Sequence, residues 1–127
     1  MPRVILEYRR ELLTVHQIRE LTDLLKRSAA IFLSTTGAHL NEEEISVKFV
    51  EAGEHDDLTH DVILHVSVQP YGNRRQEREM IVNNFLAALK SDLKRVPRGD
   101  DDPPPPRSIG VSLTFIDSEW VDWWASD

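Results

Sequence analysis

The chain has 127 residues and a mass of 14.6 kDa, with 40% apolar and 29% charged residues. This composition predicts a single folded domain, 1–127, rather than a disordered segment. Its net charge of −7 argues against a nucleic-acid-binding or membrane-binding surface, because both need a basic face. The absence of cysteine excludes disulfides, thiol nucleophiles and thiolate metal sites.

The first half of the chain predicts a strand, a helix and a second strand. Residues 2–8 alternate apolar and polar side chains with a period of two, which is typical of a strand. Thr14 and Gln17 have the spacing of a capping box at a helix start, and Gly37 is predicted to end that helix. The apolar face of this helix consists of Ile18, Leu21, Leu25, Ala29 and Phe32. Residues 45–51 alternate again and form the second predicted strand.

The second half repeats this order. Residues 61–69 alternate as a third strand, and Asn73 is predicted to cap a second helix with Gln76 at the reciprocal position. The buried face of that helix consists of Ile81, Phe85, Leu86, Leu89 and Leu93. Residues 96–108 hold four consecutive prolines and predict an irregular loop, and residues 109–115 alternate as a fourth strand.

These elements divide into two similar β-α-β units, at about 2–51 and 62–116. The predicted fold class is α/β (α+β): a two-layer sandwich with a four-stranded mixed sheet and two helices on one face. The other face of the sheet is also partly apolar, through Ile5, Val50, Ile63 and Ile116. We therefore expect an oligomer that covers this face, the alternative being isolated exposed apolar residues.

Other residue types predict few special sites. The five histidines lack metal-ligand spacing, and there is no glycine-rich phosphate loop, so neither a metal nor a cofactor is expected. The acidic runs at 42–44 and 100–102 are interpreted as solvated loops. Trp120, Trp123 and Trp124 are predicted to anchor the C-terminal segment to the domain or a neighbouring subunit. No apolar run approaches the length of a membrane span, about 18 residues, and we expect a cytoplasmic protein.

Pro2 is the first candidate for chemistry. Removal of Met1 exposes a secondary amine, and an α-amino group titrates close enough to neutrality to act as a general base. If Met1 is retained, Pro2 is an amide and has no basic nitrogen. The structural alternative is a proline that simply starts an edge strand.

Arg74 and Arg75 are the second candidates. On the first turn of the predicted helix they oppose the helix dipole, and such a broken local rule suggests a carboxylate-binding site. Lys48 lies on the strand face opposite Ile45, Val47 and Phe49 and is a third candidate cation. The alternative is that the side chains of all three residues are simply exposed to solvent and bind no ligand.

The Met-Pro start, the β-α-β-β-α-β order and an arginine after the third strand together resemble the tautomerase superfamily. HDVILHVSVQPYGNRRQ, residues 60–76, is similar to the corresponding segment of the 5-carboxymethyl-2-hydroxymuconate isomerase family. VSLTFIDSEWVDWW, residues 111–124, resembles the malonate semialdehyde decarboxylase branch. The proline-rich loop, 96–108, has no counterpart in this resemblance.

The resemblance implies a mechanism and an assembly. Pro2 would be the catalytic group, and Arg74, or Arg75 as an alternate, would bind the carboxylate of a small anionic carbonyl substrate and stabilise its enolate. Lys48 would replace an arginine, because Ser46-Val47-Lys48 is similar to an SVR segment of small tautomerases. A homotrimer with sites at the subunit boundaries is the implied assembly.

Three functions stay open at this point. The first is an isomerase or tautomerase that uses the N-terminal proline as a general base on a small carboxylated keto/enol substrate. The second is a decarboxylase or a dehalogenase-like hydratase of the same superfamily, in which Glu42 is the candidate acid by its spacing from Ser46. The third is a non-catalytic ligand-binding or interaction module, since ferredoxin-like folds share this element order.

Overall fold

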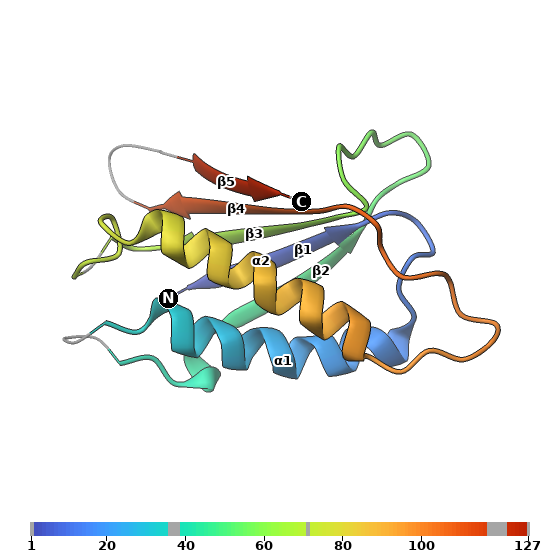
Figure 1. Ribbon diagram of the computed structural model, residues 1–127, viewed down its shortest axis with the longest axis horizontal. Coiled ribbons are helices and arrows are strands. Elements are labelled where there is room, and N and C mark those ends of the chain that lie inside the picture. Colours follow the sequence, from blue (N-terminus) through green and yellow to red (C-terminus); the bar gives the residue numbers. More distant parts are fainter. Residues whose placement is uncertain (1, 36–38, 71, 117–121, 127) are drawn as a thin grey trace.

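The alternating segments and the two amphipathic segments form a sheet with two long helices on one of its faces (Figure 1). The computed structural model describes residues 2–35, 39–70, 72–116 and 122–126. Its elements are β1 (Arg3–Tyr8), α1 (Val15–Leu33), the 3-10 turn η1 (Glu42–Glu44), β2 (Ser46–Glu51), β3 (Val62–Val68), α2 (Arg78–Arg95), β4 (Ile109–Phe115) and β5 (Asp122–Ser126).

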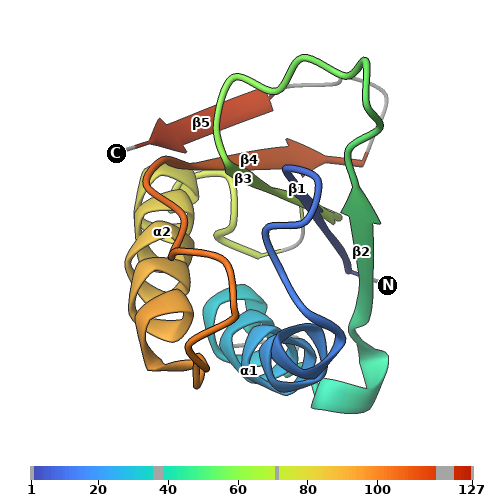
Figure 2. The same ribbon diagram turned by 90° about the vertical axis from the view of Figure 1, so that its right-hand side faces the viewer.

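The sheet has the strand order β2-β1-β3-β4-β5. β1 is parallel to β2, and β3 is parallel to β4, so each half of the chain is a β-α-β unit. The two halves meet through the antiparallel pair β1 and β3. Seen along the sheet, both helices lie on the same side of it, which confirms the predicted two-layer sandwich (Figure 2).

The fifth strand was not predicted. Residues 122–126 pair with β4 in antiparallel register, from Gly110 opposite Ser126 to Thr114 opposite Asp122. Without this pairing, β4 would end the sheet with a row of unpaired backbone N–H and C=O groups. Trp123 and Trp124 belong to β5, whereas Trp120 lies outside the described residues, so the anchoring role of the tryptophans stays a prediction.

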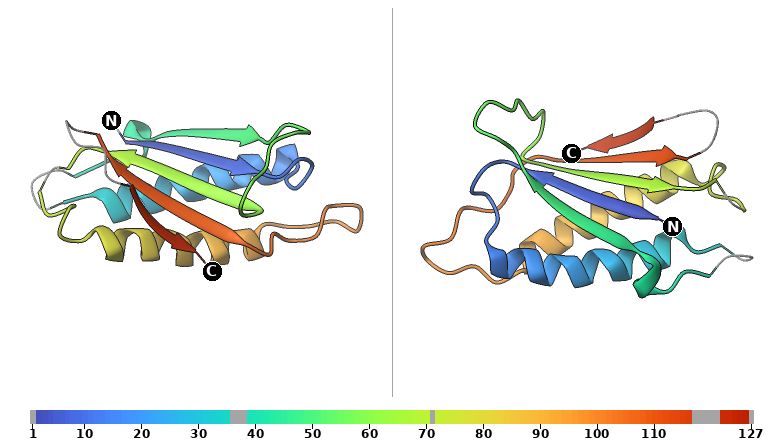
Figure 3. Two further views of the ribbon diagram at one scale, coloured as in Figure 1. Left: turned by 90° about the horizontal axis from the view of Figure 1, so that it is seen from above. Right: turned by 180° about the vertical axis from the view of Figure 1, so that it is seen from behind.

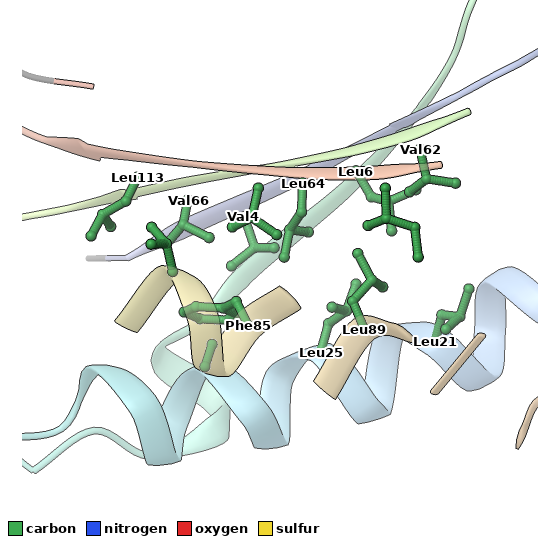
Figure 4. Packing of buried hydrophobic residues seen from close by; sticks show 14 of the residues in the cluster. Val4, Leu6, Leu21, Leu25, Val62, Leu64, Val66, Phe85, Leu89 and Leu113 are labelled. Atoms are coloured by element: carbon green, nitrogen blue, oxygen red, sulfur yellow. The ribbon is translucent and has the colours of Figure 1, made fainter. Parts of the chain in front are cut away.

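The core fills the space between the sheet and the helices. Alternate residues of the central strands point toward α1 and α2, where leucines of α1 and Phe85 and Leu89 of α2 meet them (Figure 4). Phe32 and Phe85 join the two helices edge to face, with ring centroids 5.1 Å apart. Full burial of one such apolar side chain stabilises the fold by about 1.5–3 kcal/mol, so this layer supplies most of the driving force.

The predicted capping box of α1 is confirmed. The Thr14 hydroxyl accepts the Gln17 N–H at 3.2 Å, and the Gln17 side-chain oxygen accepts the Thr14 N–H at 2.9 Å. α1 ends at Leu33 with Ser34 as its cap, and Gly37, the predicted end, lies outside the described residues.

The predicted start of the second helix is wrong. Asn73 does not cap α2, which begins at Arg78 with Glu77 at its N-cap and no side-chain cap. The segment before it is a turn, in which the Asn73 carbonyl accepts the Glu77 N–H at 3.1 Å. Arg74 and Arg75 therefore lie in this turn rather than on the first helical positions. The physical reason is the burial of Arg74, described below, which draws the turn toward α1.

The face of the sheet opposite the helices is partly covered by the chain itself. The connection between β2 and β3 rises over this face (Figure 3). Its His60 ring packs on Gly110, where an added Cβ would lie 3.3 Å from His60 Nδ1. Of the four predicted apolar residues on this face, Ile63 is buried, Ile5 and Val50 are half-buried, and Ile116 is exposed.

Asp92 is a polar exception in the buried layer. Its side chain is 7% exposed, and its Oδ2 has no hydrogen-bond partner among the described residues. Burial raises the pKa of Asp92, against the smaller opposing effects of Arg95 and Arg27. Ionised Asp92 therefore opposes folding, and this penalty appears as the pH rises through the raised pKa.

We expect Asp92→Asn to raise the free energy of unfolding by about 1 kcal/mol near neutral pH, because it removes a buried charge without changing shape. The gain should shrink at acid pH, because the native carboxyl, whose pKa is raised by burial, then takes up its proton. Urea unfolding at both pH values measures this, with Asp23→Asn on the exposed face of α1 as the matched control. A gain that is independent of pH would contradict the assignment.

Candidate functional site

The topology brings the start of β1 to the end of the sheet where β3 and β4 finish. Arg3 pairs with Ser67 across the antiparallel strands, and Val68 pairs with Phe115. Ser46 donates its N–H to the Pro2 carbonyl at 3.2 Å, which holds the residue before β1 in the sheet. α1 ends and α2 begins at this same end (Figure 1).

Pro2 is buried and lies on the helix side of the sheet. It stands two residues before Val4, which is fully buried beneath the helices, and side chains alternate along a strand. Continuing the β1–β3 register places Pro2 opposite Val68 and in one row with Phe115. With strands about 4.8 Å apart, the Cα atoms of Pro2 and Phe115 are roughly 10 Å apart.

Arg75 reaches the same row from the turn before α2. Its guanidinium carbon lies 5.2 Å from the centroid of the Phe115 ring, within the range of a cation–π contact. The Arg75 side chain is half-buried. A positive charge is thereby held beside the buried end of the sheet that contains Pro2.

Arg74, the neighbour of Arg75, is buried and binds backbone carbonyl groups. It is 3% exposed, its Nε donates to the Leu33 carbonyl at 2.9 Å, and its Nη1 donates to the Gln69 carbonyl at 2.7 Å. Gly72 has a φ of 61°, and an added Cβ there would lie 3.1 Å from the Thr35 side chain. The turn therefore packs closely on the end of α1, with Arg74 joining the two.

The remaining predicted residues lie apart from this group. Lys48 is exposed and pairs with Ile5, which places it on the sheet face away from the helices and so away from the Pro2 side. Glu42 is exposed in η1, and its Oε1 lies 3.9 Å from Arg27 Nε. Within one chain, Pro2, Arg74 and Arg75 therefore lie at the same end of the sheet, Lys48 lies on the opposite face, and Glu42 lies beside Arg27.

A hydrogen-bonded pair on the open face, His65 and Glu7, was missed by the sequence reasoning. His65 Nε2 and Glu7 Oε1 are 2.6 Å apart, with about a third of each side chain exposed. The alternation of side chains along β1 and β3 places both residues on the outward face, and this pattern was the only indication of the pair in the sequence. Their pairing required the β1–β3 register, which places Ile5 opposite His65.

The described residues offer no evident metal centre and no membrane span. No group of three or more His, Asp or Glu side chains among them is arranged to hold a metal ion. Neither α1 nor α2, as described, is long and apolar enough to cross a bilayer. A cavity of about 450 Å³ lies beside the end of α1, lined by Ile31, His39, Leu40 and the Arg27–Glu42 pair among others.

No protein-family model matches the sequence, and no curated protein matches it significantly. Solved structures do match. A macrophage migration inhibitory factor-like protein from Entamoeba histolytica has a TM-score of 0.56 at 8% identity, over 91% of this chain and 88% of that chain. Malonate semialdehyde decarboxylase has a TM-score of 0.55 at 14% identity, over 93% and 88%. A domain of unknown function from Sebaldella termitidis has a TM-score of 0.51 at 11% identity, over 97% and 100%.

The chain shares its overall fold with these proteins. The first two of these neighbours are tautomerase-superfamily proteins, and the alignments span nearly the whole of each chain. At these identities the likeness concerns the fold, and it agrees with the predicted two-unit architecture.

We expect Arg74→Gln to lower the free energy of unfolding by about 2–4 kcal/mol, because it leaves two carbonyl groups without a charged donor. Urea unfolding measures the loss. Arg19→Gln, on the exposed surface of α1, makes the same change in charge and should shift the unfolding free energy by less than about 0.5 kcal/mol. Equal effects of the two substitutions would show that the buried contacts of Arg74 do not stabilise the turn.

Proposed function

We propose that this protein is a tautomerase-type isomerase that acts on a small carboxylated keto or enol compound. The observation that carries the proposal is that the Arg75 cation stacks on Phe115 at the end of the sheet, in the same row of residues as Pro2, in a fold shared with two tautomerase-superfamily proteins. One structural neighbour, malonate semialdehyde decarboxylase, has been solved both as the wild type and as a variant whose first residue, a proline, is replaced by alanine. That replacement is a reason to test the N-terminal proline of this chain as well.

The proposed reaction moves one proton. Removal of Met1 turns Pro2 from an amide into a secondary amine, whose lone pair takes a proton from the carbon beside the substrate carbonyl. The electrons of that C–H bond form the enolate, and the protonated Pro2 then returns the proton to a second carbon. With an enol substrate, Pro2 takes the proton of the enol hydroxyl instead and delivers it to carbon. A nearby cation lowers the pKa of an amine, so Arg75 would favour the basic form of Pro2.

Arg75 is the proposed partner for the substrate carboxylate and the enolate oxygen. It is half-buried over Phe115, so its charge acts where water is partly excluded. Arg74 is the proposed positioning residue, because two of its donors already hold the Leu33 and Gln69 carbonyls. Tethering of the turn by Arg74 would fix the direction in which Arg75 leaves it.

Lys48 gives a reason to propose a homotrimer. It faces the side of the sheet opposite to Pro2, so it would serve a Pro2 site only in a neighbouring copy. Packing between copies would also cover Ile116, which is 37% exposed. We propose the cytoplasm as the compartment on the composition alone.

A decarboxylase or hydratase reaction is the second candidate. It is favoured by the likeness to malonate semialdehyde decarboxylase, a protein with both decarboxylase and hydratase activities. The addition of water needs an acidic residue that, as a carboxylate, takes a proton from the attacking water. Glu42 is the candidate acid, but within one chain it lies beside Arg27. Analysis of the products separates the two reactions, since decarboxylation releases carbon dioxide and ketonisation does not.

We expect Pro2→Ala to lower kcat/KM for the ketonisation of phenylenolpyruvate or 2-hydroxymuconate by roughly a hundredfold or more, the usual contribution of a general base. The mass of each purified chain must first establish that Met1 has been removed. Circular dichroism serves as the control for folding. Undiminished activity of Pro2→Ala would refute the assigned base, and an inactive wild-type chain that lacks Met1 would favour the non-catalytic binding module.

We expect Arg75→Gln to lower kcat/KM for a carboxylate substrate by roughly a hundredfold, because a charge that stabilises the enolate is lost. The methyl ester of the same substrate should lose less, since it has no carboxylate for Arg75 to bind. Kinetics with the acid and its ester measure this difference. An equal loss for both compounds would argue against recognition of the carboxylate by Arg75.

A further inference from the structure

We propose a second binding site, for a small amphipathic carboxylate, between the C-terminal half of α2 and the proline-rich loop. A cavity of about 280 Å³ lies there, lined by residues of α2, the loop and the start of β4. The loop runs back along the end of α2 before it enters β4 (Figure 1 and Figure 2). Nothing in the proposed proton transfer uses this region.

The floor and one wall of the cavity are apolar. They consist of Leu93 of α2, Pro105 and Pro106 of the loop, and Ile109 of β4. Proline rings have a fixed backbone φ and little freedom to collapse, so consecutive prolines make a stiff wall. This surface suits the apolar body of a ligand.

The loop is held in place by hydrogen bonds at both of its ends. Arg98 donates from Nη2 to the Leu93 carbonyl at 3.3 Å and from Nη1 to the Pro103 carbonyl at 3.1 Å. At the other end, the Arg107 N–H donates to Asp61 Oδ2 at 2.9 Å. The cavity is therefore formed before a ligand arrives, which lowers the entropic cost of binding.

Three cations line the same cavity. Lys90 and Lys94 belong to α2, and Arg107 belongs to the loop. Among the described residues that line the cavity, none is acidic, although the whole chain carries a charge of −7. The helix dipole accounts for a cation in the last turn, such as Lys94, but not for Lys90 one turn earlier or for Arg107 on another segment.

This combination identifies the class of ligand. Binding sites for small molecules are mainly apolar with a few placed polar groups, and this volume lies at their lower end. A carboxylate would lie among the three cations while an aromatic or branched body contacts the prolines. The rise of α2 places Lys90 roughly 20 Å from the turn that holds Arg75, so the two sites are separate.

Titration of the ¹⁵N-labelled full chain with phenylacetate, followed by NMR, tests the site. We expect saturable shifts at the amides of Leu93, Lys94, Arg107 and Ile109, and binding of the neutral phenylacetamide at least about tenfold weaker. The Lys94→Gln/Arg107→Gln double variant should weaken phenylacetate binding by about tenfold or more. Both side chains are exposed, so the fold should tolerate the change.

Arg95→Gln is the control for charge. Arg95 follows Lys94 on the same helix but does not line the cavity, and its substitution should weaken binding by less than about twofold. Three results would overturn the site: equal weakening by Arg95→Gln and by the double variant, equal binding of the acid and the amide, or shifts confined to Arg3, Val68 and Arg75. The titration needs neither removal of Met1 nor turnover, so a failure of the proline chemistry leaves its outcome unaffected.

Discussion

A buried guanidinium joins the two halves of this protein at the end of the sheet. The last carbonyl groups of a helix have no intrahelical donor, and Arg74 supplies one to Leu33 while it also binds Gln69 after β3. An arginine keeps its charge at any physiological pH, so carbonyl dipoles must compensate it where it is buried. The turn of residues 72–77 is therefore held against the end of α1, and α2 begins only after it.

The position of Arg75 depends on this anchoring of the turn by Arg74. Two consecutive residues in a turn point in different directions, so once Arg74 enters the core, Arg75 emerges beside Phe115. The positive φ of Gly72 and its close approach to Thr35 allow the turn to pack this tightly. A cation is thus held beside Pro2 by the same contacts that hold the two β-α-β units together.

Local patterns predicted those parts of the fold that local chemistry determines. The period of two in β1 to β4 and the Thr14–Gln17 capping box both depend on neighbours within a few residues. The start of α2 could not be predicted in this way, because Asn73 satisfies the local rule for a cap while the distant Leu33 carbonyl binds the next residue. β5 was not predicted for a similar reason, since its partner, the edge of β4, exists only in the folded sheet.

In the candidate site, too, some features were predictable from the sequence and others were not. The resemblance implied that Pro2 and the two arginines belong to one site, and the register places them at one end of the sheet. The different surroundings of Arg74 and Arg75 were not predictable, because both are adjacent arginines in one polar segment. Nor was the His65–Glu7 pair, since opposition across β1 and β3 depends on register rather than on alternation alone.

Part of the acidity of the chain has a structural use in its loops. Three loop aspartates each accept a backbone N–H: Asp56 from Gly53 at 2.6 Å, Asp102 from Gly99 at 2.7 Å, and Asp61 from Arg107 at 2.9 Å. The Arg107 N–H is the main cause that holds the pKa of Asp61 below its usual value, so this carboxylate stays ionised where it ties the loop. These three acids stabilise loop conformations. The net charge of −7 is therefore compatible with local positive charge at each of the two proposed anion sites.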